Sequence, residues 1–358
     1  MAQDDVTAES EREALNTGVK PVAESHKFDE AKLAEWMAAN VAGYEGPLEV
    51  RQFKGGQSNP TYQLITPAKK YVLRRKPPGK LLPSAHAVDR EFRVISALYP
   101  TGFPVPRPYG LCTDEAVIGT MFYIMDMVEG RILWDQSLPD YAPPERHAIH
   151  MGALKTLADL HNTDYLAIGL EGFGREGNYM QRQIARWTKQ YKASETVHLE
   201  KMERLIEWLP RTTPADDQTT IVHADYRLDN MVMHATESRV VAVLDWELST
   251  LGNPLADFSY VLMQWVNGAI SNIPDFEARG IPTVKEYVDA YCKWTGRDGL
   301  PNLEWYFAYN SFRLAGILQG IVGRVRDGTA NSPQAAAMSD RVPLLVDSAW
   351  AFAERAGA

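Results

Sequence analysis

Residues 221–234 read IVHADYRLDNMVMH, and this stretch decides the fold class of the chain. An apolar strand end leads into Asp225, and Asn230 follows five residues later. Fifteen residues beyond Asn230, a second apolar run, VVAVL, ends at another carboxylate, Asp245. Mg²⁺-assisted phosphoryl transfer requires a carboxylate that accepts a hydroxyl proton, together with an amide and a carboxylate that hold hard cations. The joint spacing of the three residues favours that chemistry over a loop that is merely polar.

The sequence around this motif predicts two lobes of different kinds. Residues 48–75 contain the strand-like runs LEVRQF, TYQLIT and YVLRR, each bounded by Gly, Pro or a polar pair, which predicts antiparallel strands. Later in the chain, apolar residues recur mostly at helical spacing. We therefore predict an α+β fold, with a small β-rich lobe over residues 28–128 and a larger helical lobe over residues 129–358. Residues 1–27 are polar and lack periodicity, which predicts a disordered leader.

Charge and cysteine usage exclude several classes of protein. Lys plus Arg is 37 and Asp plus Glu is 46, which gives a formal net charge of −9 and disfavours a nucleic-acid partner. No run approaches the roughly 18 apolar residues of a membrane span, and the first 25 residues contain no apolar block, so we expect no signal peptide among them. The two cysteines, Cys112 and Cys292, lie 180 residues apart, which argues against a disulfide framework or a structural zinc site. These features predict a cytoplasmic protein that binds no membrane.

The sequence HADYRLDN followed by VLDWE resembles the catalytic and metal-binding motifs of the aminoglycoside phosphotransferase family, within the protein-kinase-like two-lobe fold. The resemblance covers roughly residues 28–330. Two further stretches, GGQSNPTY and YVLRRKPPGKLLPSAHAVDREF, are similar to the branch whose kinase-like domain is fused to, or encoded beside, acyl-CoA dehydrogenases. The resemblance implies an ATP- and Mg²⁺-dependent transfer to the hydroxyl group of a small molecule. A hydroxyacyl-CoA or a hydroxy acid is the suggested acceptor, with a functional link to an acyl-CoA dehydrogenase.

The resemblance also implies roles for the residues of the motif. Asp225 matches the catalytic base, and Asn230 and Asp245 match the two Mg²⁺ ligands. Arg227 follows the base by two residues, where a guanidinium would neutralise the transferred group or else lie on the surface. Glu247 would lie beside the second metal or cap a turn.

Two other residues match structural positions of the family. His223 is expected to be a hydrogen-bonding residue behind the catalytic loop rather than a proton carrier. Asp257 resembles the buried aspartate that supports this loop through backbone N–H groups.

The predicted β-rich lobe holds the candidate nucleotide-binding residues. Glycine N–H groups and a short hydroxyl suit phosphate oxygens, which indicates a phosphate-covering loop. The candidate residues of this loop are Gly55, Gly56, Ser58 and Asn59. Strand alternation places Arg74 where the family usually has an ATP-anchoring lysine, with Glu91 as its expected ion-pair partner. Asp126 and Val128 match the hinge, whose backbone groups would bind the adenine edge.

The sequence leaves the acceptor open. Two stripes at helical spacing would suit an anionic substrate, although packed aromatics with solvated arginines are the favoured interpretation. The residues of these stripes are Arg182, Arg186, Trp187, Tyr306, Tyr309 and Arg313. The first alternative function is phosphorylation of an aminoglycoside, which needs an acceptor pocket lined with carboxylates. The second alternative is a nucleotide-binding scaffold without catalysis.

Overall fold

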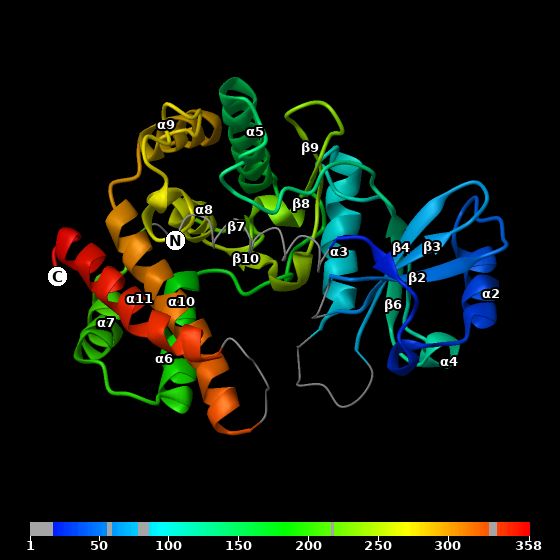
Figure 1. The fold of residues 1–358 in the computed structure, drawn as a ribbon, viewed down its shortest axis with the longest axis horizontal. Coiled ribbons are helices and arrows are strands. Elements are labelled where there is room, and N and C mark those ends of the chain that lie inside the picture. Colours follow the sequence, from blue (N-terminus) through cyan, green and yellow to red (C-terminus); the bar gives the residue numbers. More distant parts are fainter. Residues whose placement is uncertain (1–16, 56–58, 78–85, 216–217, 329–334) are drawn as a thin grey trace. The chain divides into compact units, whose positions relative to one another are not determined.

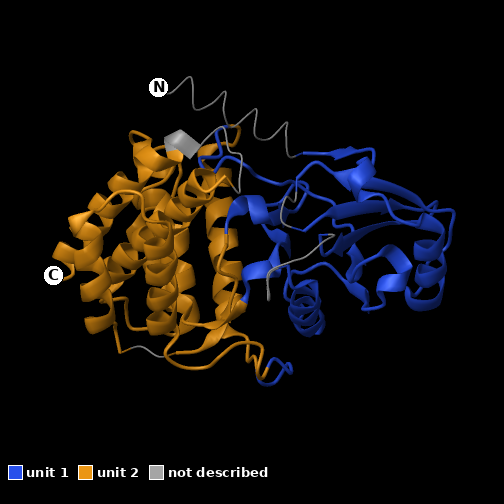
Figure 2. Cartoon of the chain, turned by 90° about the horizontal axis from the view of Figure 1, so that it is seen from below, with its two compact units in different colours: residues 1–139, 166–170, 227–249 blue, residues 140–165, 171–226, 250–358 orange. Residues whose placement is uncertain are grey.

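The structure is a computed structural model that describes residues 17–55, 59–77, 86–215, 218–328 and 335–358. Its chain divides into two compact units, shown in different colours in Figure 2. Unit 1 comprises residues 1–139, 166–170 and 227–249, and unit 2 comprises residues 140–165, 171–226 and 250–358. The sequence boundary after residue 128 therefore differs from the structure, because the segment with Asn230 and Asp245 belongs to the strand-rich unit.

Unit 1 is built on a six-stranded sheet of the order β1-β2-β3-β4-β6-β5 (Figure 1). Its strands are β1 (Val19–Lys20), β2 (Glu49–Phe53), β3 (Thr61–Ile65), β4 (Lys70–Arg75), β5 (Pro108–Cys112) and β6 (Phe122–Asp126). Every neighbouring pair is antiparallel, which includes the predicted meander of β2, β3 and β4. The meander forms because short β-prone runs alternate with tight polar turns.

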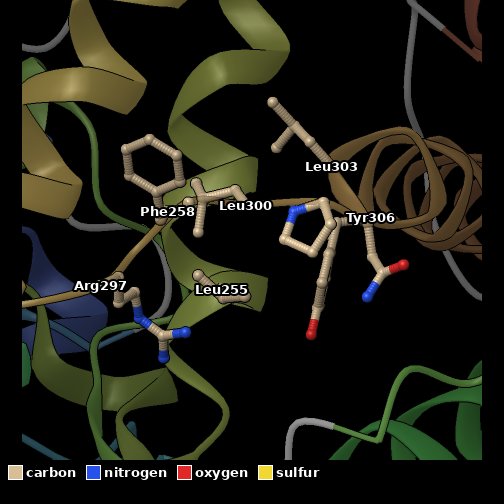
Figure 3. Close-up of a pocket in the computed structure, with 9 residues that line it drawn as sticks. Leu255, Phe258, Arg297, Leu300, Leu303 and Tyr306 are labelled. Carbon is tan, nitrogen blue, oxygen red and sulfur yellow. The ribbon is translucent and has the colours of Figure 1, made fainter.

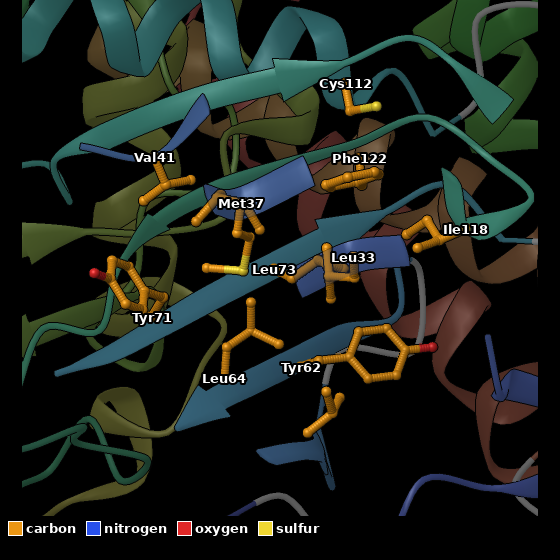
Figure 4. Close-up of a cluster of buried hydrophobic side chains, with 12 residues drawn as sticks. Leu33, Met37, Val41, Tyr62, Leu64, Tyr71, Leu73, Cys112, Ile118 and Phe122 are labelled. Carbon is orange, nitrogen blue, oxygen red and sulfur yellow. The ribbon is translucent and has the colours of Figure 1, made fainter. Parts of the chain in front are cut away.

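One face of this sheet is covered by α2 (Glu30–Asn40), whose N-cap Asp29 accepts hydrogen bonds from two backbone N–H groups of the first turn. Leu33 and Met37 of α2 are fully buried against Tyr62 and Leu73 of the strands, as Figure 4 shows. The helix α3 (Val88–Leu98) contacts β5 and β6 and carries the completely buried Glu91. The unit also contains the short helices η1 (Glu24–His26), η2 (Tyr99–Thr101) and α4 (Glu115–Ile118).

The disordered leader predicted for residues 1–27 is wrong from residue 17 onward. Val19 and Lys20 pair with β2 in an antiparallel register. The carbonyl of His26 accepts a hydrogen bond of 2.8 Å from Arg75. These distant partners order the segment. Its own sequence has no periodic pattern, so the order could not be predicted from it. Residues 1–16 lie outside the described residues.

The segment 227–249 adds a hairpin of β8 (Met231–Met233) and β9 (Val240–Val243), flanked by η3 (Leu228–Asn230) and η4 (Trp246–Leu248). The hairpin is joined to the rest of unit 1 by backbone hydrogen bonds. The N–H of Val243 donates to Pro104 at 2.8 Å, and Arg131 and Met233 form an isolated bridge. Gly130 lies so close to this bridge that a Cβ atom would be 2.2 Å from the Met233 carbonyl oxygen, so glycine is required there.

Unit 2 is mainly helical, as predicted. Its helices are α5 (Pro143–Asn162), α6 (Tyr179–Ser194), α7 (Glu200–Arg211), α8 (Pro254–Val266), η5 (Ile270–Asn272), α9 (Val284–Thr295), α10 (Leu303–Arg326) and α11 (Ala335–Arg355). The long helix α10 packs against α11, α6 and α8. The strand β7 (Thr220–Val222) pairs with β10 (Thr250–Gly252), and the loop with Asp225 follows β7. Within the described ranges, no helix combines the length and apolar character needed to cross a membrane.

Candidate active site

A buried ion pair joins the sheet of unit 1 to α3. Nε of Arg74 on β4 lies 2.9 Å from Oε2 of Glu91, and the two side chains are 11% and 1% exposed. The Tyr123 hydroxyl donates to the same carboxylate at 3.1 Å. The pairing of Arg74 with Glu91 that the family resemblance implied is therefore present. An arginine suits this position because its planar fork can meet more than one carboxylate.

The same guanidinium contacts Asp245, which directly follows the β9 segment. Nη2 of Arg74 donates to Oδ1 of Asp245 at 2.9 Å, and the Asp245 side chain is 34% exposed. Asp245 has a φ of +62°, a left-handed conformation that is strained for a residue with a side chain. Such strain is typical of functional positions, and here it aims the carboxylate at Arg74.

In this cluster, burial and the neighbouring charges shift the pKa values of Arg74 and Glu91 in opposite directions. Burial raises the pKa of Glu91, and the adjacent Arg74 guanidinium limits the rise. Burial by itself lowers the pKa of Arg74, but the carboxylates of Glu91, Asp245 and Glu247 together with Tyr123 raise it above its ordinary value. Arg74 is therefore a permanent positive charge among three carboxylates, and phosphate oxygens would enter the same field.

The structure corrects the expected role of the Asn59 side chain. Asn59 is fully buried, and its amide donates to Oε1 of Glu91 at 2.8 Å and to Oε2 of Glu247 at 3.3 Å. Its oxygen lies 3.0 Å from Nδ1 of His86. The side chain thus links α3 to Glu247 instead of facing phosphates, because the buried carboxylate of Glu91 needs a donor there. Of the other predicted loop residues, Gly55 is described and partly exposed, whereas Gly56 and Ser58 lie outside the described residues.

The two predicted metal ligands are brought together within unit 1. Asn230 is the last residue of η3, and its carbonyl accepts a hydrogen bond of 2.8 Å from Leu244, the neighbour of Asp245. A carboxylate and an amide oxygen are the hard ligands that Mg²⁺ prefers, so this donor set fits the ion. The guanidinium of Arg227 lies 3.1 Å from Oδ2 of Asp229, so Arg227 is half-buried in an ion pair rather than solvated.

The predicted hinge residue Asp126 ends β6. Its carboxylate lies 2.6 Å from Nζ of Lys69 and accepts a hydrogen bond of 2.7 Å from the Tyr109 hydroxyl. Its backbone N–H donates to Arg107. The Asp126 side chain therefore connects strands of unit 1, and backbone groups near Val128 are left as the candidate adenine contacts.

In unit 2, the loop after β7 holds Asp225 in a fixed backbone conformation. Both oxygens of Asp257 accept backbone hydrogen bonds, from His223 at 2.7 Å and from Ala224 at 2.8 Å. The N–H of Asp225 donates to Nδ1 of the buried His223 at 3.3 Å. Ala224 has a φ of +67°, a strained conformation that these bonds help to maintain. His223 and Asp257 thus have the supporting positions that the sequence suggested.

Asp257 is charged in spite of its burial. Burial raises its pKa, but His161, whose Nε2 lies 3.5 Å from Oδ2, and the backbone N–H of His223 bring the pKa below its ordinary value. The folded state therefore favours the ionised carboxylate more than the unfolded chain does. This contribution to stability is complete above the unfolded pKa and is lost as pH falls through the folded pKa.

We expect Asp257→Asn to lower the free energy of unfolding by about 3 kcal/mol at pH 7, because the buried donors lose a carboxylate. The deficit should begin to shrink as pH falls below about 4, where the carboxylate of the unfolded chain becomes protonated, and it should be lost as pH falls through the lower folded pKa. Chemical denaturation across this pH range measures both effects. Asp289→Asn, at a 61% exposed side chain of α9, is the matched control and should stay near wild type. A deficit that is constant with pH would contradict the assignment.

The structure adds two residues to the Asp225 loop that the sequence did not assign to it. Tyr260 of α8 donates from its hydroxyl to Oδ1 of Asp225 at 3.1 Å. Arg313 of α10 donates from Nη2 to the carbonyl of Ala224 at 2.9 Å. The expectation that Arg313 is solvated is therefore wrong, whereas Tyr306 and Tyr309 are packed aromatics as expected, each 1% exposed. No local pattern distinguishes a loop-binding arginine from a solvated one.

A second arginine lies near this group on α6. The guanidinium carbons of Arg186 and Arg313 lie 5.2 Å and 5.9 Å from the ring centre of Trp187. Trp187 is buried, and Arg186 is exposed. Arg182, in contrast, donates to the backbone carbonyls of Gly177 and Arg175, so it stabilises the turn before α6.

Two other features of unit 2 lie outside this group. A pocket of about 100 Å³ is shown in Figure 3. Its lining residues are Leu255, Phe258, Arg297, Gly299, Leu300, Pro301, Asn302, Leu303 and Tyr306.

Separately, Glu195, His198 and Glu203 could offer metal ligands, but Lys192 is ion-paired with both glutamates. This cluster is a surface salt-bridge group.

The chain has the kinase-like fold. One unit has a six-stranded antiparallel sheet with a buried Arg–Glu pair, and the other is helical and holds the Asp225 loop through Asp257. The model of the Phosphotransferase enzyme family matches residues 49–306, and the chain belongs to this family.

Three comparisons show what the chain is similar to. Acyl-CoA dehydrogenase family member 10 of Mus musculus is 41% identical over 368 residues, which cover 98% of this chain and 34% of that protein. The chain thus spans about a third of this curated relative. A crystal structure from Ralstonia eutropha, assigned to the aminoglycoside phosphotransferases, is 49% identical with a TM-score of 0.86, and the match covers 93% of this chain and 100% of that one. A complex of an aminoglycoside phosphotransferase with ADP and hygromycin B has a TM-score of 0.58, 15% identity and coverage of 89% and 98%, and so supports the fold alone.

Proposed function

We propose that the chain transfers the γ-phosphoryl group of ATP to a hydroxyl group of an anionic small molecule. The observation that carries this proposal is the supported Asp225, whose loop is held by Asp257 and whose carboxylate accepts a hydrogen bond from Tyr260. A carboxylate in one fixed orientation suits a base that receives the proton of an attacking hydroxyl. The suggested acceptors are hydroxy acids and hydroxyacyl-CoA thioesters.

The groups of unit 1 suit the nucleotide. Asn230 and Asp245 would hold Mg²⁺, which neutralises charge on the phosphates. Arg74, already ion-paired with Glu91 and Asp245, would neutralise phosphate oxygens, with backbone N–H groups near Gly55 beside them. The presence of ADP in a complex of the family's fold supports ATP as the donor. Arg227 stays a candidate for charge neutralisation at the transferred group.

The charge of unit 2 near Asp225 favours an anionic acceptor. Arg313 donates to the backbone beside Asp225, and Arg186 lies over the same tryptophan ring as Arg313. Neither guanidinium is ion-paired with a carboxylate within the described ranges. These positive charges would repel a polycationic aminoglycoside, whereas they would attract an acceptor that carries a carboxylate or a phosphate. The similarity to acyl-CoA dehydrogenase family member 10 supports a functional link to an acyl-CoA dehydrogenase.

An acceptor screen that measures ADP formation tests this function. The panel contains hydroxy acids, their CoA thioesters, neutral sugars and aminoglycosides, each with Mg²⁺ and ATP. We expect turnover with an anionic hydroxyl compound. Turnover with aminoglycosides alone would establish antibiotic phosphorylation instead, and ATP binding without any turnover would establish a non-catalytic scaffold.

We further expect Arg186→Ala to raise KM for the anionic acceptor by about fivefold, because an exposed charge pair contributes up to about 1 kcal/mol. KM for ATP and kcat should change little. Lys189→Ala, at an exposed cation one turn further along α6, is the matched control and should leave both KM values unchanged. Steady-state kinetics at low and high salt check this, and equal effects of the two variants would contradict a specific role for Arg186.

A further inference from the structure

Two side chains from different helices meet at the Asp225 loop. The Tyr260 hydroxyl donates to Oδ1 of Asp225 at 3.1 Å, and Nη2 of Arg313 donates to the Ala224 carbonyl at 2.9 Å. The guanidinium carbon of Arg313 also lies 4.9 Å from the ring centre of Tyr260. Arg313 therefore contacts both the backbone that precedes Asp225 and the ring of Tyr260, whose hydroxyl binds the Asp225 carboxylate.

The helix α8 supports this loop at two points. Asp257 receives the backbone N–H groups of residues 223 and 224, and Tyr260 lies three residues further along the helix. Residues spaced by three share one helix face, so a single rigid element sets the loop backbone and the side chain of Asp225 together. Movement of α8 would change both.

The position of α8 is in turn held by α10. Asn310, which is fully buried, donates to the Ser259 hydroxyl at 2.8 Å and approaches the Ala256 carbonyl at 3.5 Å. Arg313 follows Asn310 by three residues on α10. The same face of α10 thus fixes α8 through Asn310 and the loop through Arg313.

The chemical consequence concerns the two oxygens of Asp225. A hydrogen bond to Oδ1 restricts rotation of the carboxylate and so favours one orientation for proton transfer. Ala224 has a left-handed conformation, which is strained for a residue with a side chain and persists only where surrounding contacts maintain it. Arg313 supplies one of those contacts from the carbonyl side.

We propose that Tyr260 and Arg313 are positioning residues that act as one unit, Tyr260 orienting the Asp225 carboxylate and Arg313 holding its backbone and the Tyr260 ring. The inference rests on the proposed function only in taking Asp225 as the proton acceptor. The structural part, that the two side chains hold the loop, stands independently of the reaction.

The kinetic test uses Tyr260→Phe, which removes one hydroxyl and keeps the ring. We expect kcat to fall about tenfold, as a misoriented base costs rate rather than binding, while KM for ATP and for the acceptor and the thermal midpoint stay unchanged. Tyr191→Phe, at a fully buried tyrosine of α6, is the matched control and should keep wild-type kcat. Wild-type kcat in Tyr260→Phe, or a lower midpoint with a parallel rise in KM, would overturn the positioning role.

Arg313→Ala tests whether Tyr260 and Arg313 act together. We expect a similar loss of kcat, and the double variant should lose less than the product of the two single losses. Multiplicative losses would show independent sites and overturn the joint role.

Hydrogen exchange of peptides that contain residues 223–226 gives a readout without turnover. Both single variants should exchange faster there than wild type, whereas Tyr191→Phe should not. Unchanged exchange in both would overturn the inference even for an enzyme whose acceptor is unknown. Absence of turnover in wild type, with faster exchange in the variants, would count against the proposed function and still support the positioning role.

Discussion

Asp225→Asn should reduce phosphoryl transfer by about 10²–10⁴-fold, because a general base contributes roughly this factor to rate. The amide oxygen can still accept the Tyr260 hydroxyl, and the hydrogen bonds of Asp257 to residues 223 and 224 do not involve the changed group. The loop is therefore expected to keep its conformation. ATP affinity should stay near wild type, because the candidate nucleotide contacts belong to unit 1.

Calorimetry of ATP binding and single-turnover kinetics separate these effects. Asp159→Asn, at a 48% exposed aspartate of α5, has the same chemical change in the same unit and should keep wild-type turnover. If Asp225→Asn turned over the acceptor at the wild-type rate, the base would have to be another residue. If ATP binding failed as well, the change would have damaged more than proton transfer.

Asp245→Ala should weaken Mg²⁺-dependent ATP binding by at least about tenfold, since even partners that only orient a metal ligand cost about 10–100-fold when removed. The change also deletes one carboxylate from Arg74, which keeps its 2.9 Å contact with Glu91. Because the Asp245 side chain is 34% exposed, the fold should tolerate the loss. Titration of Mg²⁺ at fixed ATP measures the effect.

The control for Asp245 is Glu237→Ala, at a 56% exposed carboxylate near the turn between β8 and β9. It removes the same charge from the same hairpin segment and should leave Mg²⁺ dependence unchanged. Binding of ATP with excess chelator should be equal in wild type and Asp245→Ala. An unchanged Mg²⁺ titration in Asp245→Ala would place the metal on other residues.

The sequence by itself predicted the strand meander, the helical second half and the faces on which Arg74 and Glu91 lie. It could do so because these features follow from local rules. Strand alternation gives the face of Arg74, and helical spacing puts Glu91 on the buried side of α3. The motif around Asp225 likewise singled out Asn230 and Asp245, and the structure joins their segments through the Leu244 to Asn230 hydrogen bond.

The limits of sequence reasoning lie in partners far apart along the chain. Arg74 and Asp245 are separated by 171 residues, and Asn59 and Glu247 by 188, so no periodic pattern connects them. The prediction of a disordered leader failed at Val19 for the same reason, because the strand there is ordered by its pairing with β2. Periodicity describes which face a residue occupies and not which residue it meets.

The sequence therefore determined the chemical types available for catalysis, namely the carboxylates and the amide of one motif and the cation of one strand. Only the tertiary structure decided which of them are held in place and by what. Tyr260 and Arg313 reach the Asp225 loop from α8 and α10, 35 and 89 residues away from their hydrogen-bond partners. Such support depends on helix packing, because a side chain's partner is set by where its whole element lies in the fold.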